Sequence, residues 1–205
     1  MDIDLATSGL ERIVGSDPPL DTIAHGLYFG EGPVWDRRNR RFLWTDIIGD
    51  TIWQWTPGVG KQIVIHPSSH ANGMTFDREG RLHVSSRFDG SVHQVDARGR
   101  SKVVATDLGV ACGIAFGPNG DLFVGDRSGS ILRVAGERTE IIATLPGSVA
   151  AFHLAFGPEG YLYVAAPTVS STDGLYRISP DGKTEQFGTR FGRPQGIAFD
   201  ADGRL

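Results

Sequence analysis

Residues that could do chemistry recur along this chain at a nearly constant spacing. Five related segments begin with Glu31, Asn72, Cys112, Phe152 and Gln195. Their starts are separated by 41, 40, 40 and 43 residues. A carboxylate and two amides supply oxygen ligands, which a hard divalent cation prefers. His153 follows Phe152 and titrates near neutral pH, so it is the candidate proton carrier.

The residue after each of these positions is glycine in four segments and His153 in the other. Glycine lets a backbone approach a ligand closely, which favours a binding site. The alternative is that the five positions only mark the start of a repeating unit, with polar side chains facing a water-filled channel. The spacing alone leaves both interpretations open.

Each segment leads into a turn and a second apolar strand, which defines a repeat. Residues 72–77 alternate with a period of two, as a β-strand does. Asp77 opens the turn and Gly80 closes it, which suits a type I turn with glycine in the left-handed conformation. Further strands are expected over residues 82–86, 92–95 and 102–105. Four short antiparallel strands in about 40 residues predict a propeller blade.

The repeat predicts an all-β fold with very little helix, because no segment sustains an apolar stripe of helical period. From Glu31 the chain holds four full units and the opening of a fifth. We expect a polar lead-in over residues 1–22 and a single β-propeller domain over 23–205 that is incomplete at its C-terminal end. Residues 22–30 are expected to form a strand of the kind that completes the last blade of a closed propeller.

Composition excludes several classes of protein. The formal net charge is −4, which argues against a general binder of nucleic acid or anionic membranes. One cysteine cannot form an intramolecular disulfide, and no run of 18 apolar residues is present to span a membrane. The acidic start lacks the apolar segment of a signal peptide, so we expect a cytoplasmic protein acting on a small molecule. The sequence does not predict an oligomeric state.

Histidine pairs at short spacing do not predict a further site. His66 and His70 are spaced like half of a zinc site, but no third ligand is nearby in sequence, so a polar turn is expected. His83 and His93 lie on adjacent strands of one predicted blade and are expected to form a cross-strand surface pair.

Two longer motifs carry a resemblance to a known family. Gly30-Glu-Gly-Pro-Val-Trp-Asp36, followed one unit later by Ala71-Asn-Gly-Met-Thr-Phe-Asp77, resembles the gluconolactonase/regucalcin family, which is also called senescence-marker-protein-like. The resemblance covers roughly residues 10–205. It implies a six-bladed β-propeller, of which this chain holds about four and a half blades. It also implies one divalent metal ion, calcium or zinc, and hydrolysis of sugar lactones or similar cyclic esters.

The family's functional residues match this chain only in part. Glu31 matches the metal-binding glutamate, and Asn72 matches an asparagine that faces the channel. Where the family has Asn-Asp, Asn-Gly and Asp-Gly, this chain has Cys112-Gly113, Phe152-His153 and Gln195-Gly196. The resulting set is poor for calcium and suits zinc better, provided that the thiol and the imidazole face inward.

We therefore expect Glu31, Asn72 and Gln195 as metal ligands, His153 as the catalytic residue, and Cys112 and Asp126 as substrate-binding residues. Each has an alternative role. Cys112 could be a small buried hydrophobic residue, His153 could point into the blade, and Asp126 could cap a turn.

Two functions follow from the sequence. The first is a metal-dependent lactonase-type hydrolase, in which a metal held by Glu31 polarises the lactone carbonyl and activates water. The second is a non-catalytic propeller that binds a small ligand or a protein partner at the channel mouth. The loss of three family ligands and the long loop 167–173 favour the second function. The family resemblance implies the first, and we take the lactonase-type hydrolase as the expected function. A strictosidine-synthase-like enzyme is a further alternative, since segments 113–116 and 122–126 also resemble that group.

Overall fold

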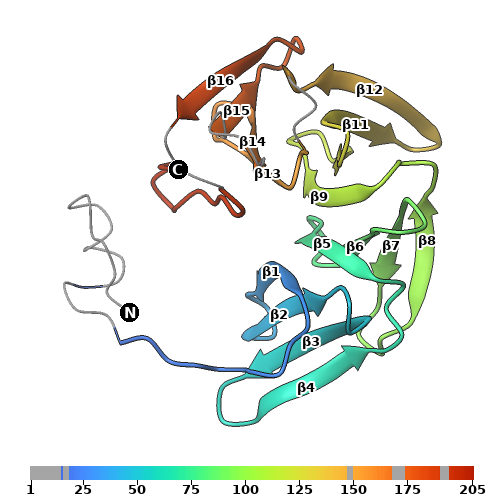
Figure 1. The fold of residues 1–205 in the computed structure, drawn as a ribbon, viewed down its shortest axis with the longest axis vertical. Coiled ribbons are helices and arrows are strands. Elements are labelled where there is room, and N and C mark those ends of the chain that lie inside the picture. The colour runs from blue at the N-terminus through green and yellow to red at the C-terminus, as the bar shows by residue number, and fades with distance from the viewer. Residues whose placement is uncertain (1–14, 16–18, 147–149, 168–173, 190–193) are drawn as a thin grey trace.

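The computed structural model describes residue 15 and residues 19–146, 150–167, 174–189 and 194–205. These residues form sixteen strands in four antiparallel sheets and no α-helix, which confirms the predicted all-β fold (Figure 1). Within the same residues, no helix is long and apolar enough to cross a membrane.

Each sheet consists of four consecutive strands paired in chain order, so each is one propeller blade. Blade 1 comprises β1 (Gly30–Asp36), β2 (Arg41–Asp46), β3 (Thr51–Thr56) and β4 (Gly60–Ile65). Blade 2 comprises β5 (Ala71–Phe76), β6 (Leu82–Ser86), β7 (Ser91–Val95) and β8 (Ser101–Ala105). Blade 3 comprises β9 (Ala111–Phe116), β10 (Leu122–Asp126), β11 (Ser130–Ala135) and β12 (Arg138–Thr144). Blade 4 comprises β13 (His153–Phe156), β14 (Leu162–Ala166), β15 (Gly174–Ile178) and β16 (Thr184–Thr189).

The predicted turn that ends in glycine is confirmed in the four units that begin at residues 72, 112, 152 and 195. Gly80 has a φ of +78°, and its N–H donates to the Asp77 carbonyl at 3.0 Å. The equivalent glycines at 120, 160 and 203 also have positive φ and make the same hydrogen bond. Glycine is required here because side chains strain the left-handed conformation.

The first strands of the four blades lie innermost and pack against one another in the order β1, β5, β9 and β13 (Figure 1). The repeated glycines make this packing possible. A Cβ at Gly73 would lie 2.4 Å from the Cys112 carbonyl oxygen, and one at Gly113 would lie 2.4 Å from that of Phe152. These glycines therefore approach the backbone of the next blade, rather than a ligand as the sequence suggested.

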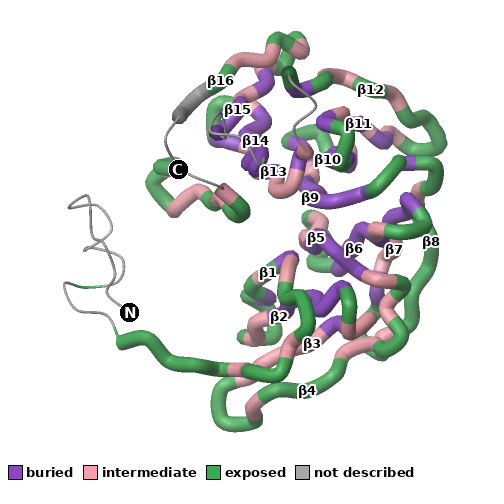
Figure 2. The backbone as a smooth tube through the Cα atoms, viewed as in Figure 1, coloured by how far each residue is buried: buried purple, intermediate pink, exposed green. Residues whose placement is uncertain are grey.

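Apolar side chains pack between neighbouring blades. The buried residues lie mainly on the inner strands of each blade, as Figure 2 shows along the backbone. Three clusters result, one at each blade–blade interface. Between blades 1 and 2 lie Leu43, Ile52, Ala71, Met74, Leu82, Val84 and Val95. Between blades 2 and 3 lie Val92, Leu108, Ala111, Ile114, Leu122, Val124, Leu132 and Val134. Between blades 3 and 4 the members include Phe123, Ile131, Leu145, Leu154, Leu162, Val164, Tyr176 and Ile178.

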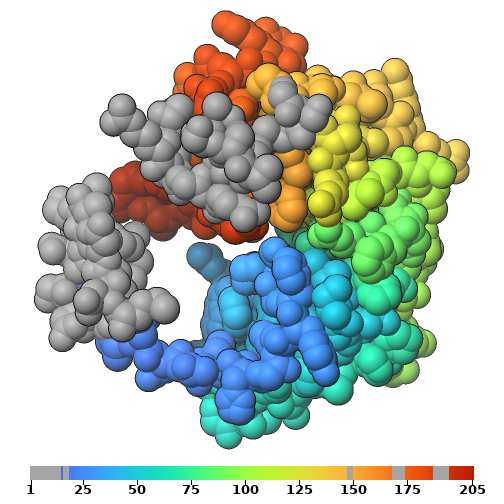
Figure 3. Space-filling view, viewed as in Figure 1, coloured from blue at the N-terminus to red at the C-terminus, as the bar shows by residue number. Residues whose placement is uncertain are grey.

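Blade 1 has one large apolar face that no described blade covers. Strand pairing places all four tryptophans of the chain on this face: Trp35, Trp44, Trp53 and Trp55. Phe42 and Trp44 occupy the positions that Leu82 and Val84 fill in blade 2, where they pack on the preceding blade. Trp35 is 47% exposed. The blades thus form an open arc, and Figure 3 shows the opening between the blue and red ends of the chain.

Two expected strands at the ends of the arc do not form. Residues 19–29 contain no strand, and β1 begins at Gly30. The backbone N–H groups of Tyr28 and Phe29 donate to the Asp46 carboxylate, and the Phe29 carbonyl accepts from the Ile47 N–H at 3.0 Å, so the end of this segment is held without forming a strand. Residues 194–200 likewise form no strand, although the turn over 200–204 is closed by two backbone hydrogen bonds. The described chain is therefore four blades with a docked segment of the fifth unit, rather than four and a half blades.

Candidate functional site

A cavity of about 450 Å³ lies at the inner edge of the opening in the arc. It brings together three of the predicted site residues, Glu31, His153 and Gln195. The remaining lining comes from blade 1, from residues 23–27 and from Gly196. These residues are Ile23, Ala24, Leu27, Gly30, Pro33, Phe42, Trp44 and Gly196. The cavity therefore combines three polar groups with a largely apolar wall.

Glu31 lies near the start of β1, where it pairs with Thr45 of β2. Its side chain is half-buried, and this burial raises the pKa of its carboxyl group. A hydrogen bond from the Gly32 backbone and the positive charge of Arg87 oppose the shift. The net direction is upward because desolvation disfavours the charged carboxylate.

His153 is the first residue of β13 and pairs with Ala165 of β14. Burial lowers the pKa of its imidazole. The ring is therefore neutral at pH 7, which is the state in which a histidine can accept a proton. Because His153 lines the cavity, this capacity is available to a bound molecule.

Asn72 and Cys112 belong to the same repeat position as Glu31 but do not line the cavity. Asn72 is 4% exposed, and its Nδ2 donates to the Ala111 carbonyl at 3.5 Å. Cys112 is fully buried, and its thiol donates to the Val110 carbonyl at 3.3 Å. Burial raises the pKa of the thiol to about 11, so Cys112 is protonated at neutral pH. Both side chains contact the backbone of the arc.

Asp126 also lies outside the cavity lining, at the end of β10. Its carboxylate accepts hydrogen bonds from the backbone N–H groups of Val110, at 2.7 Å, and Ser128, at 3.0 Å. Asp46 occupies the same place in blade 1 and accepts from Tyr28, Phe29 and Gly49. In the structure both aspartates hold the loops that enter and leave a blade.

The donor groups in the cavity do not make up a calcium site. Among the residues that the structure describes, no three His, Cys, Asp or Glu side chains lie close enough together to hold a metal ion. Glu31 is the one carboxylate in the lining, beside an amide and an imidazole. Calcium prefers several oxygens and more than one negative charge. The carboxylate, amide and imidazole are thus an incomplete set for the metal that the resemblance implies.

Two features of the site were not anticipated from sequence. Phe42 and Trp44 form part of the wall, because no described blade occupies the space in front of them. Arg87 follows β6 and is close enough to affect the pKa values of both Glu31 and Cys112. Arg87 directly follows the second strand of blade 2, and the repeat alone could have identified this position.

The predicted histidine pair in blade 2 is wrong. His83 pairs with Gln94, and His93 pairs with Val84, so the two rings lie on opposite faces of the sheet. His83 is 7% exposed and packs edge-to-face on Phe116 of blade 3. The loop 167–173, expected to influence binding, falls almost wholly on residues outside the described part of the chain.

Known proteins resemble this chain in sequence and in fold. A gluconolactonase from Zymomonas mobilis is 24% identical over 208 residues, which cover 94% of this chain and 52% of that protein. This chain therefore spans about half the length of its curated relative. A gluconolactonase structure from Xanthomonas campestris superposes with a TM-score of 0.54 at 15% identity, covering 89% of this chain and 83% of the other.

The same fold occurs in a virginiamycin B lyase from Staphylococcus aureus. That structure superposes with a TM-score of 0.66 at 16% identity, covering 85% of this chain and 61% of the lyase. At such identities the two structures support the propeller fold alone. The family is shown by sequence instead, since the profile described as SMP-30/Gluconolactonase/LRE-like region matches residues 29–205. The chain thus belongs to the SMP-30/gluconolactonase-like family.

Proposed function

We propose that this chain is the site-bearing part of a lactonase-type hydrolase of the six-bladed propeller type, acting on sugar lactones or similar cyclic esters. The observation that carries the proposal is that Glu31 and His153 line one cavity, although they are far apart in sequence. Family membership and the gluconolactonase relative support the reaction class.

The three polar groups of the cavity supply the parts that ester hydrolysis requires. The neutral imidazole of His153 takes a proton from the attacking water as the water oxygen bonds to the lactone carbonyl carbon. The side-chain N–H of Gln195 donates to the carbonyl oxygen, where negative charge develops. Glu31 accepts a hydrogen bond from the water and orients it.

Ring opening completes the reaction. The bond between the carbonyl carbon and the ring oxygen breaks, and the ring oxygen takes the proton from the His153 imidazolium. The product is a hydroxy acid, whose carboxyl group ionises at neutral pH. Phe42 and Trp44 supply an apolar wall against which the carbon ring of a lactone can pack.

We also propose that the site binds a divalent metal ion, calcium or zinc, and that Glu31 is one of its ligands. The described residues fall short of a calcium site, so no step above depends on a metal. If the metal is bound, the remaining ligands would have to include water or residues outside the described part of the chain. A cytoplasmic location remains a prediction from the sequence.

The experiment is a hydrolysis assay of the purified chain against a panel of sugar, aliphatic and aromatic lactones, with metal content measured on the same sample. Hydrolysis of one class that falls in His153→Asn supports the proposal. Absence of hydrolysis across the panel, with or without added calcium or zinc, contradicts it and favours the ligand-binding alternative.

A further inference from the structure

Basic side chains gather at one end of blades 1 and 2. Each blade turns twice at this end, once between its first and second strands and once between its third and fourth. These four turns and the residues beside them, which we call the basic face, cover residues 36–41, 56–61, 77–81 and 96–102. They hold ten Lys and Arg residues and four Asp and Glu residues, a formal charge of +6 in a chain of net charge −4. The low net charge of the whole chain, which argued against binding to anionic membranes, therefore hides a strongly positive region.

The positive charges of the basic face are open to solvent, whereas half of its negative charges are not. The side chains of Asp36 and Asp77 are only 4% and 6% exposed, and each is paired with an arginine of its own turn. Glu79 and Asp96 are the two acidic residues of the face that are exposed. Nine of the ten basic residues are exposed: Arg37, Arg38, Arg40, Lys61, Arg78, Arg81, Arg98, Arg100 and Lys102. A molecule that approaches this face thus meets mainly guanidinium and ammonium groups.

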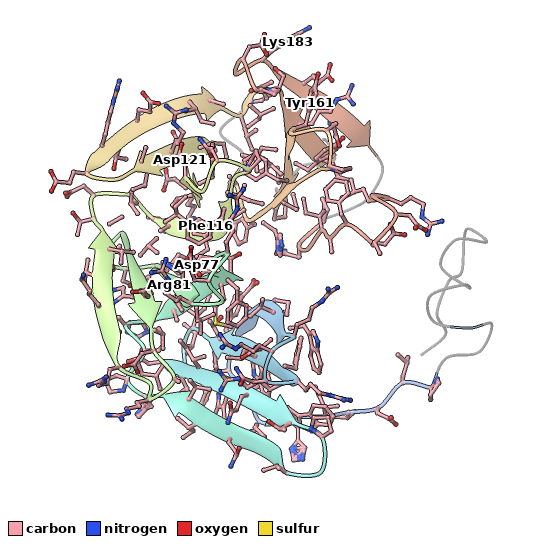
Figure 4. All side chains as sticks on the ribbon, turned by 180° about the vertical axis from the view of Figure 1, so that it is seen from behind. Asp77, Arg81, Phe116, Asp121, Tyr161 and Lys183 are labelled. Atoms are coloured by element: carbon pink, nitrogen blue, oxygen red, sulfur yellow. The ribbon has the colours of Figure 1, made fainter. Side chains whose placement is uncertain are left out.

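Contacts between neighbouring turns make the basic face continuous. A Cβ at Gly80 would lie 3.9 Å from the Arg38 guanidinium, so the first turn of blade 1 meets the first turn of blade 2. A Cβ at Gly99 would lie 2.5 Å from the Val64 carbonyl oxygen, so the second turn of blade 2 packs on β4 of blade 1. Figure 4 views the arc from behind and labels Asp77 and Arg81 in one of these turns. The turn tips therefore form one broad surface rather than separate charged loops.

The opposite end of blades 1–3 carries the opposite charge. Two arginines, Arg87 and Arg127, are outnumbered there by six acidic residues: Glu31, Asp46, Asp50, Asp89, Asp107 and Asp126. The chain is thus polarised along its strands. An anionic surface attracts the basic face and repels the other end, so the charge distribution favours one orientation.

An exposed apolar tip favours a membrane over other polyanions. Val59 lies in the turn between β3 and β4 of the basic face and is 62% exposed. Basic side chains around an exposed apolar side chain are typical of proteins that adsorb to lipid surfaces, where the cations contact the headgroups and the apolar group enters the interface. The four turns contain no aromatic residue on which a nucleic-acid base could stack.

We propose that the basic face attaches the chain to the surface of an anionic lipid bilayer, with Val59 entering the interface. Arginine suits lipid phosphates, because a guanidinium stays charged and donates two parallel hydrogen bonds. Each basic residue near such a surface raises the affinity roughly fivefold, and salt screens the attraction. Attachment does not depend on the proposed hydrolysis, since Glu31 lies at the end that faces away from the bilayer.

Co-sedimentation with vesicles tests this proposal. The vesicles are phosphatidylcholine alone or with about one third phosphatidylserine, in low salt and in about 0.5 M salt. We expect the chain to bind only the anionic vesicles and to be released at high salt. The triple variant Arg37→Gln, Arg38→Gln, Arg40→Gln should weaken this binding by about a hundredfold.

A matched triple variant controls for the change in net charge. It removes the same number of positive charges from exposed residues of blades 3 and 4, outside the basic face: Arg127→Gln, Arg138→Gln and Lys183→Gln. We expect it to bind within about twofold of the wild-type chain, because salt screens charges far from the contact. A thermal melt of each variant confirms that the fold is retained.

The apolar tip is tested by Val59→Ser, which should weaken vesicle binding by about fivefold. Ile141→Ser, at a 63% exposed residue of blade 3, should leave it unchanged. Equal weakening in the two triple variants, or equal binding to neutral and anionic vesicles, would overturn the proposal. Unchanged binding in Val59→Ser would overturn the entry of this tip into the interface. Binding of a single-stranded oligonucleotide without binding to vesicles would assign the basic face to nucleic acid and overturn membrane attachment.

Discussion

Phe199 packs edge-to-face on Tyr163 of blade 4, with the ring centroids 5.1 Å apart. The same contact recurs between earlier units, where Phe116 packs on His83 at 4.8 Å and Phe156 packs on Phe123 at 4.9 Å. Residues 194–205 therefore dock on blade 4 as each unit docks on the blade before it, even though they form no strand. The aromatic contact between units does not require the hydrogen bonds of a sheet.

The close approach of inner strands predicts an effect of Gly73→Ala. The added Cβ would lie 2.4 Å from the Cys112 carbonyl oxygen and 3.0 Å from the Gly113 Cα, and backbone atoms cannot turn aside. We expect a loss of about 1–3 kcal/mol in the free energy of unfolding, measured by urea denaturation. Gly196→Ala is the matched control, since its Cβ would meet nothing within 4 Å. Equal stability of the two variants would show that the strands do not pack this closely.

Blade 1, which holds all four tryptophans, is expected to unfold before blades 2 and 3. All four lie in blade 1, which packs against one described blade, whereas blades 2 and 3 each pack against two. Stability in such arrays depends on contacts between neighbours. On heating, the midpoint seen by tryptophan fluorescence should therefore fall below that seen by far-UV circular dichroism. Coincident midpoints would indicate one cooperative unit and contradict this prediction.

The repeat made most of the fold predictable. Period-two apolar patterns, Asp-to-Gly turns and a spacing of about 40 residues predict four-stranded blades, and all four formed as expected. The strands predicted over 22–30 and 195–200 are absent, because a strand needs a partner as well as a suitable sequence. Among the described residues, the first segment meets β2 only at its end, where Ile47 donates to the Phe29 carbonyl, and no strand pairs with residues 195–200.

The site was less predictable than the fold. The first two strands of a blade pair with a shift in register, and this shift changes the direction in which side chains at the start of the inner strand point. The register shifts between Glu31 and Val34, and again between Ala71 and Met74. Such bulges break the alternation from which orientation is inferred. Sequence therefore placed Glu31, Asn72 and Cys112 in one set, whereas the structure gives only Glu31 a place in the cavity wall.

His83 predicts a dependence of stability on pH. Burial lowers the pKa of its imidazole, although its hydrogen bond to Asp77 at 3.0 Å acts in the opposite direction. The unfolded chain therefore binds this proton more readily than the folded chain. The stabilising effect of neutral His83 is present above about pH 6.5 and is lost as the pH falls toward the lower folded pKa.

His83→Tyr should reduce that dependence, because tyrosine fills the equivalent position, 163, without titrating in this range. Urea denaturation at pH 7.5 and pH 5.5 measures the effect. We expect the wild-type chain to lose more stability between the two pH values than the variant does. Parallel losses would show that His83 does not carry the effect.

His153 predicts the pH dependence of hydrolysis. Because burial lowers the pKa of its imidazole, the neutral base persists below pH 6.5. The value of kcat/KM should rise through a pKa below 6.5 and stay level above it. His153→Asn should lower kcat/KM by about a hundredfold and abolish this limb. His93→Asn, in blade 2, should leave the profile unchanged. A profile that keeps its acid limb in His153→Asn would assign the limb to another group.

The role of Glu31 in the cavity is tested most directly by lactone hydrolysis in Glu31→Gln. The change removes the carboxylate from the cavity wall at nearly constant shape, so the melting temperature should stay close to that of the wild-type chain. The account predicts that kcat/KM for the best lactone falls by about a hundredfold or more. Glu137→Gln, at an exposed turn, should retain full activity. Unchanged hydrolysis in Glu31→Gln would contradict the assignment of this cavity as the hydrolytic site.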